Sequence, residues 1–265
     1  MNIFKRELRA NLKSLLIWCA AQFFIIYAGM VKYGGFSGST VDIEKMMEQF
    51  PKALLAVFGM GTVDMSQVDG FYSIFFIFFL LLAGIHASML GVVLIAKEER
   101  DHAADFLYSK PVSRKRIITA KLAAGLFNIL IFNLLTFVAS IYCISIYNDG
   151  NPLAGKVAFL MSALLIFQVL FLCLGMAFGA LLKTAKKASA LMTGVLLGMF
   201  FLSAAIDIDE RINILKYLTP FKYYEAQSLL FGGSLPWPSL VISTVLTALA
   251  LVVTYKLFGR RDLST

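Results

Sequence analysis

The chain has 265 residues, of which 59% are hydrophobic and only 15% are charged, and its mean hydropathy is +0.80. Soluble domains are about 45–50% apolar and about 25% charged, so this composition excludes an ordinary soluble globule. The net charge of +8 does not predict nucleic-acid binding, because most basic residues stand in short segments between long apolar runs. We therefore expect an all-α protein that crosses a membrane several times.

The first segment, residues 2–14, is typical of an amphipathic helix at a membrane surface. Its basic residues stand among apolar residues at helical spacing: Lys5, Arg6, Arg9 and Lys13 among Ile3, Phe4, Leu8 and Leu12. A first span of about residues 15–31 follows. We interpret it as an uncleaved anchor and not a signal peptide, because no small-x-small exit ends the apolar run.

Residues 34–70 are expected to form a loop outside the membrane. Within it, residues 41–59 carry a broad apolar stripe that is interrupted at Pro51. We interpret this stripe as a helix-turn-helix that rests on the outer leaflet, with a role in substrate gating as the alternative.

Five further apolar runs are near or above the roughly 20 residues that cross a hydrocarbon core of about 30 Å. They cover about residues 71–96, 122–147, 157–182, 190–206 and 238–258. The sequence therefore predicts six spans, organised as a single transmembrane domain over residues 1–265.

The basic residues predict the orientation. Of the 24 lysines and arginines, 17 fall in the N-terminal tail, in 97–121, in 183–187 and at the C-terminal end, while the segments on the other side hold 7 basic and 10 acidic residues. Cytoplasmic loops carry the excess of Lys and Arg. Both termini are therefore expected in the cytoplasm.

Residues 97–121 are the densest island of charge in the chain. We expect a short polar helix from Glu98 to Asp105, with aromatic and apolar residues on its trailing turn. Pro111 should end this helix, because proline has no N–H to donate and disfavours helical geometry in the residue before it. Ser113 can then cap a second helix, which carries Arg114 and enters the next span.

This island resembles the first cytoplasmic loop of ABC-2 type transporter permeases. The resemblance rests on Glu98-Glu99-Arg100, on DFLYSKPVSR at residues 105–114, and on Lys121-Leu122, although His102-Ala103 stands where many members have Gly-Thr. FKREL near the N-terminus resembles the family's elbow helix, and residues 215–224 resemble the Pro-Phe-aromatic segment before its last span. The resemblance implies a type V exporter-like permease fold with an N-terminal elbow helix.

In this family the loop is a coupling helix that docks onto a separate ATPase subunit. The resemblance therefore implies that the coupling residues are Glu98, Glu99, Arg100, Asp101, Asp105, Phe106, Leu107, Tyr108, Pro111 and Arg114. It also implies two permease protomers, identical or homologous, with two ATPase chains that carry ATP and Mg in a bacterial cytoplasmic membrane. This chain has no GxxxxGK[ST] sequence, so we expect no cofactor of its own.

Two pairs of glycines are spaced for close helix packing. Gly175 and Gly179 lie in the fourth span, and Gly194 and Gly198 lie in the fifth. Because the first and fifth spans of two protomers meet in the resembled family, the Gly194 pair is the candidate for the dimer interface. Internal packing is the alternative for either pair.

Ionisable and polar residues inside spans are candidates for a pathway or for helix packing. His86 in the second span can hydrogen-bond a neighbouring helix or line the substrate path. Asn128 and Asn133 have the same alternatives. For these two residues and for Thr136 and Gln168, interhelical hydrogen bonds of about 0.6 kcal/mol are the default explanation. Cys19, Cys143 and Cys173 fall in apolar runs without metal spacing, and we interpret them as buried hydrophobes.

These features predict the membrane subunit of an exporter for hydrophobic or amphipathic cargo, such as a drug, an antibiotic, a lipid or a peptide. The alternatives are an ion-coupled carrier and an integral membrane enzyme. A carrier would need intramembrane charges or broken helices near the midplane, and an enzyme would need a clustered catalytic set.

Overall fold

The computed structural model describes residues 3–37, 64–100, 113–148, 153–182, 184–232 and 235–260. This part of the chain consists of helices joined by short turns and has no β-strand. The long helices are α1 (Ile3–Ser37), α4 (Val68–Arg100), α6 (Arg114–Ser145), α7 (Ala154–Leu181), α8 (Ala185–Ile208) and α11 (Trp237–Arg260). Each contains a stretch long and apolar enough to cross a membrane, which confirms the six predicted spans.

The helices extend beyond the predicted apolar runs into flanking polar residues. The start of α6 follows the prediction: Ser113 is its N-cap, and the Ser113 hydroxyl accepts a hydrogen bond from the backbone N–H of Arg116 at 3.4 Å. The predicted stripe at residues 41–59 falls outside the described residues, so its interpretation stays a prediction.

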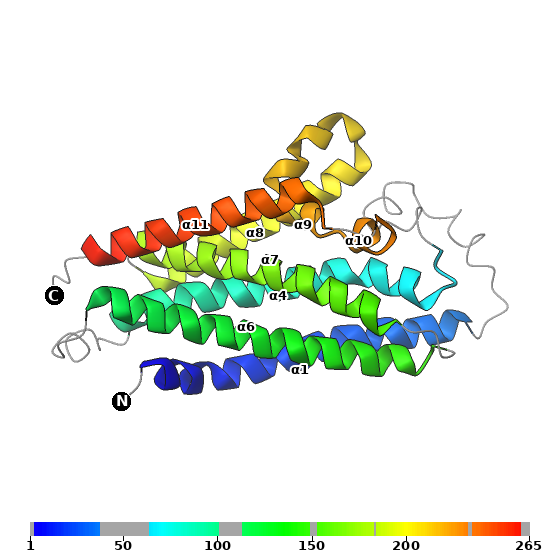
Figure 1. The fold of residues 1–265 in the computed structure, drawn as a ribbon, viewed down its shortest axis with the longest axis horizontal. Helices are drawn as coiled ribbons and strands as arrows, with labels where there is room; N and C mark the ends of the chain where they lie inside the picture. The colour runs from blue at the N-terminus through cyan, green and yellow to red at the C-terminus, as the bar shows by residue number, and fades with distance from the viewer. Residues whose placement is uncertain are drawn as a thin grey trace.

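The six long helices form two rows of three (Figure 1). One row contains α1, α4 and α8, and the other contains α6, α7 and α11, with α4 and α7 in the middle of their rows. The first turn of α1 and the last turn of α11 lie at the same end of the bundle as the end of α4 and the start of α6. This arrangement fits termini on one side of the membrane, and their cytoplasmic orientation stays a prediction.

The N-terminal segment was expected as a helix separate from the first span, whereas α1 is one continuous helix. Its first turns pack against α6, because the rings of Phe4 and Phe127 lie 6.0 Å apart between their centroids. A separate elbow helix stays a prediction.

A compact hairpin joins α8 to α11 at the far end of the bundle. It consists of the 3₁₀ helix η1 (Glu210–Leu218), α9 (Pro220–Tyr223) and α10 (Ala226–Gly232). Of the aromatic residues in this segment, Tyr217 is exposed, whereas Phe221, Tyr223 and Tyr224 are buried inside the protein. The reason is packing against the bundle. The rings of Phe221 and Phe167 of α7 lie 5.1 Å apart between their centroids, and the hydroxyl groups of Tyr224 and Ser243 of α11 form a hydrogen bond of 2.7 Å.

The two central helices, α4 and α7, touch backbone to backbone through glycines. A Cβ atom added to Gly175 would lie 2.2 Å from the carbonyl oxygen of Ser88, and one added to Gly91 would lie 2.2 Å from that of Leu172. A Cβ on Gly179 would also meet the α4 backbone. The pair Gly175 and Gly179 therefore serves packing within the protomer, the alternative that was left open for it.

Gly175→Ala is expected to lower the stability of the protein by about 1–3 kcal/mol, because the new methyl group must push α4 and α7 apart. The apparent melting temperature in detergent measures this effect. Gly155→Ala in the same helix is the matched control, since a Cβ there meets no described atom within 4 Å. Equal melting temperatures for the two variants would contradict the close contact.

Candidate functional site

The segment that resembles a coupling helix follows α4 in the chain and precedes α6. The backbone of residues 98–100 belongs to the last turn of α4, and Arg114 is the first residue of α6. The other predicted coupling residues lie outside the described residues: Asp101, Asp105, Phe106, Leu107, Tyr108 and Pro111. The role of the segment therefore stays a prediction, while its two attachment points can be described.

A buried lysine connects the two attachment points. The side chain of Lys121 in α6 has no exposed surface, and its Nζ donates to the carbonyl oxygen of Leu94 in α4 at 2.5 Å. Burying an ammonium group is costly unless it is well hydrogen-bonded, so the group is held where such partners exist. This bond fixes the position of α6 against α4 close to the predicted coupling segment.

The start of α6 is also attached to the last helix. Arg114 Nη1 donates to the carbonyl oxygen of Phe258 in α11 at 3.5 Å, and the hydroxyl groups of Thr119 and Tyr255 hydrogen-bond each other at 2.8 Å. The predicted coupling segment therefore starts and ends on a base made by α4, α6 and α11. A force on the segment would reach all three helices.

His86 lies inside the protomer between α1 and α6. Its ring stacks on Phe132 and contacts Trp18, and it is almost completely buried. Among the described residues, His86 Nδ1 and the side-chain oxygen of nearby buried Asn128 have no hydrogen-bond partner. Burial within one protomer favours the packing role for His86, and its role in a pathway stays a prediction.

Asn133 links α6 to α7. Its side-chain amide donates to the carbonyl oxygen of Met161 at 3.0 Å and to Oε1 of Gln168 at 3.4 Å. These are the interhelical hydrogen bonds that were expected as the default for polar groups in these spans. Thr136 instead donates to a carbonyl within its own helix, that of Phe132 at 2.8 Å.

Gly194 and Gly198 lie on the exposed face of α8. A Cβ atom added to either would meet no described atom within 4 Å. Apart from Lys186, the exposed residues of α8 lie along one stripe of the helix: Lys187, Ala190, Leu191, Gly194, Gly198, Phe201 and Ile208. This pair therefore has no packing partner within the described part of the protomer, in contrast to Gly175 and Gly179.

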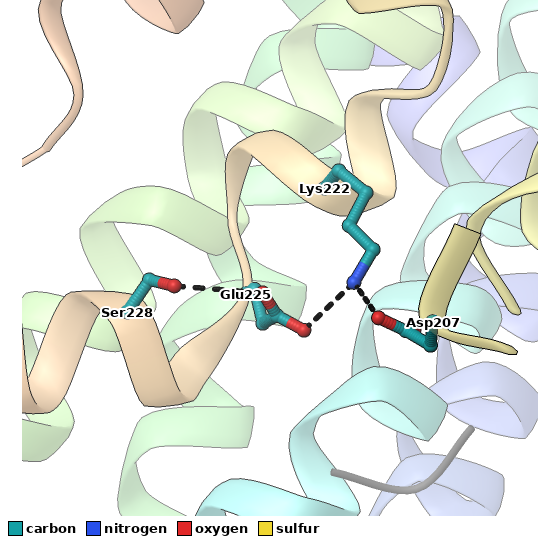
Figure 2. A network of polar contacts seen from close by, with 4 residues as sticks. All are labelled: Asp207, Lys222, Glu225 and Ser228. Carbon is teal, nitrogen blue, oxygen red and sulfur yellow. Dashed lines mark hydrogen bonds and ion pairs between the residues drawn. The ribbon is translucent and has the colours of Figure 1, made fainter. Parts of the chain in front are cut away.

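A cluster of ion pairs stands at the end of the bundle opposite the termini. Figure 2 shows the ammonium of Lys222, on α9, between the carboxylates of Asp207 on α8 and Glu225 just before α10. The distance to Glu225 Oε1 is 3.0 Å, and Ser228 donates to the other oxygen of Glu225 at 3.4 Å. Burial lowers the pKa of Lys222, but the two carboxylates raise it more, so the net shift is upward and the lysine stays charged.

Sequence reasoning missed the burial of Lys121 and the cluster around Lys222. A signal for the cluster existed, because Asp207 directly follows the apolar run of the fifth span and Lys222 and Glu225 are three residues apart. Bringing them together required the hairpin. In the part of the chain that the structure describes, no group of three or more His, Cys, Asp or Glu side chains could hold a metal ion.

Comparison with protein families assigns nearly the whole chain. The family model described as ABC-2 family transporter protein matches residues 1–263, and a search of curated proteins finds no match. This match covers all six membrane-spanning helices, both attachment points of the charged segment and the hairpin before α11. The chain therefore belongs to the ABC-2 transporter family and is a multi-pass membrane permease.

Proposed function

We propose that this chain is the membrane subunit of an ATP-driven exporter, with ATP hydrolysis on separate ABC ATPase chains. Family membership supports a permease, and ABC-2 permeases generally work with ABC ATPases. The complete complex would contain two permease protomers, identical or homologous, and two ATPase chains that bind ATP and Mg. The termini and the coupling segment would face the cytoplasm of a bacterial cell.

The observation that carries this proposal is the attachment of the predicted coupling segment. Lys121 joins α6 to α4 beside the segment, and Arg114 joins α6 to α11. A loop that only connected two spans would not need a buried charge at its base, because burial of an ammonium is costly. Movement of a docked ATPase would thus be transmitted into α4, one of the two central helices, and not absorbed by a loose loop.

The row α1, α4 and α8 offers a face for the second protomer. Gly194 and Gly198 allow another backbone to approach α8, and α1 exposes large apolar residues such as Ile17 and Phe24. Between these two helices, α4 has a partly exposed apolar stripe that includes Met89, which is 36% exposed. Two protomers joined through α1 and α8 would enclose these stripes of α4, and an apolar wall suits hydrophobic or amphipathic cargo.

Replacing Phe106 with Ala is expected to weaken the contact with the ATPase by about 2 kcal/mol, which is roughly 30-fold in affinity, if this aromatic side chain is a hot spot of the interface. Asp105→Ala should weaken it further by removing a charge partner. Copurification of the ATPase and its cargo-stimulated activity in the same membranes measure both effects.

Phe231→Ala is the matched control for the coupling test, because Phe231 is an exposed phenylalanine at the opposite end of the bundle. It should leave the ATPase contact unchanged. A Phe106→Ala, Asp105→Ala double variant with an unaltered complex and full cargo-responsive turnover would remove this segment from the mechanism.

Replacing both Gly194 and Gly198 with Leu is expected to separate the protomers or to abolish transport, because the larger side chains prevent close approach at α8. Crosslinking between cysteines introduced on the exposed face of α8 measures the association. The control is Gly155→Leu, a glycine of α7 that also has open space around it. Unchanged crosslinking and transport in the double variant would place the dimer interface elsewhere.

A further inference from the structure

A pocket opens beside the Lys222 cluster, between α4, α8 and the hairpin. Two kinds of side chain line it. The polar ones include Asp207 and Ser203 of α8 and Glu225 of the hairpin, and the apolar ones include Ile77 of α4 and Phe221 of α9. On α8, Ser203 and Asp207 are one helical turn apart and therefore share a face. The pocket thus has a charged end and an apolar wall.

The charges at this pocket do not balance. Two carboxylates, Asp207 and Glu225, belong to its lining, while a single cation, Lys222, reaches them from α9 outside the lining. Only Oδ1 of Asp207 takes part in the ion pair with Lys222. Its second oxygen has no hydrogen bond among the described residues and can accept one from a ligand.

Ser203 adds an independent sign of a ligand. The residue is only 2% exposed and lines the pocket, yet its hydroxyl has no hydrogen-bond partner in the described part of the chain. Serine in a helix can donate to the carbonyl three or four residues earlier. Ser203 makes neither bond, and the carbonyl of Met199, four residues earlier, accepts instead from the hydroxyl of Thr219 at 2.8 Å. The Ser203 hydroxyl is therefore available to the pocket.

We propose that this pocket binds the ammonium group of a cationic amphiphile. The ammonium would be held by Asp207 and Glu225, with the hydroxyl of Ser203 accepting a hydrogen bond from it, and the attached hydrocarbon would pack against Ile77 and Phe221. In the free protein Lys222 forms ion pairs with Asp207 and Glu225, so the ligand and Lys222 compete for the same carboxylates. A neutral or anionic amphiphile would not be accepted there, because it leaves the carboxylates without a second cation.

This inference rests on the proposed export function in one respect, that the amphiphile is cargo. The same ammonium chemistry occurs in the headgroup of phosphatidylethanolamine. Binding is therefore measured on the permease alone, without an ATPase, so that a failure of coupling cannot be mistaken for a failure of this site.

The probe is dansylcadaverine, a primary ammonium on a short alkyl chain with a fluorescent aromatic group, and the neutral control is its N-acetyl derivative. The permease is placed in nanodiscs of phosphatidylcholine, and empty nanodiscs correct for partition into lipid. We expect saturable binding of the cation and at least about tenfold weaker binding of the acetylated probe, since each 1.4 kcal/mol is a factor of ten.

Asp207→Asn is expected to weaken probe binding about tenfold or more, because a charge partner is lost. Lys222→Met should tighten it severalfold by removing the competing cation. The matched control is Asp69→Asn, because Asp69 pairs with Lys156 at 2.5 Å at the same end of the bundle but does not line the pocket. It should leave binding unchanged.

Ser203→Leu keeps the proposal testable if changes to the ion pairs impair folding. It fills the pocket without removing a charge, so binding should be lost in a variant that still folds. In a second arm, part of the phosphatidylcholine is replaced by phosphatidylethanolamine. Displacement of the probe would show that a lipid headgroup occupies the ammonium site. Unchanged binding would show that the site takes soluble cations, such as cargo. Equal binding of the charged and acetylated probes, or full binding in a folded Ser203→Leu variant, would overturn the proposal.

Discussion

The contact between α4 and α7 is the constraint on which the rest of the bundle depends. Carbonyl oxygens of one helix occupy the space that a side chain would fill at Gly91 and Gly175. In a membrane there is little hydrophobic driving force between helices, so close backbone packing supplies much of the attraction. Each of the other four long helices packs against at least one of these two. Their positions are therefore set by the distance that the glycines permit.

The number and approximate limits of the spans could be predicted because each is an apolar run of sufficient length. The faces of the helices could not. A side chain that contacts lipid and one that contacts another helix are equally apolar, so periodicity carries little information: Leu134 is 59% exposed, whereas Leu164 is completely buried. For the same reason the sequence left the packing of Gly175 and Gly194 undecided, and only the arrangement of the helices distinguishes them.

The candidate site was predictable where the signal is local. Ser113 caps α6 as expected, because capping depends on residues adjacent in the chain. A lysine at the end of a span suggests a side chain that reaches toward water, so the burial of Lys121 against Leu94 could not be foreseen. The cluster of Asp207, Lys222 and Glu225 left only local signals in the sequence, because its assembly depends on how the hairpin folds back on α8.

The glycine contact has a consequence for biosynthesis. During synthesis α4 enters the membrane before α7 exists, so the helix surface at Gly91 must first contact lipid or the insertion machinery. The hydrogen bond from Lys121 to Leu94 can form earlier, as soon as α6 has been made. It can hold α4 and α6 together as a pair while the ribosome completes the next span. α7 would then pack against a surface of α4 that α6 already holds in place. The order of the helices along the chain would thus also be an order of assembly.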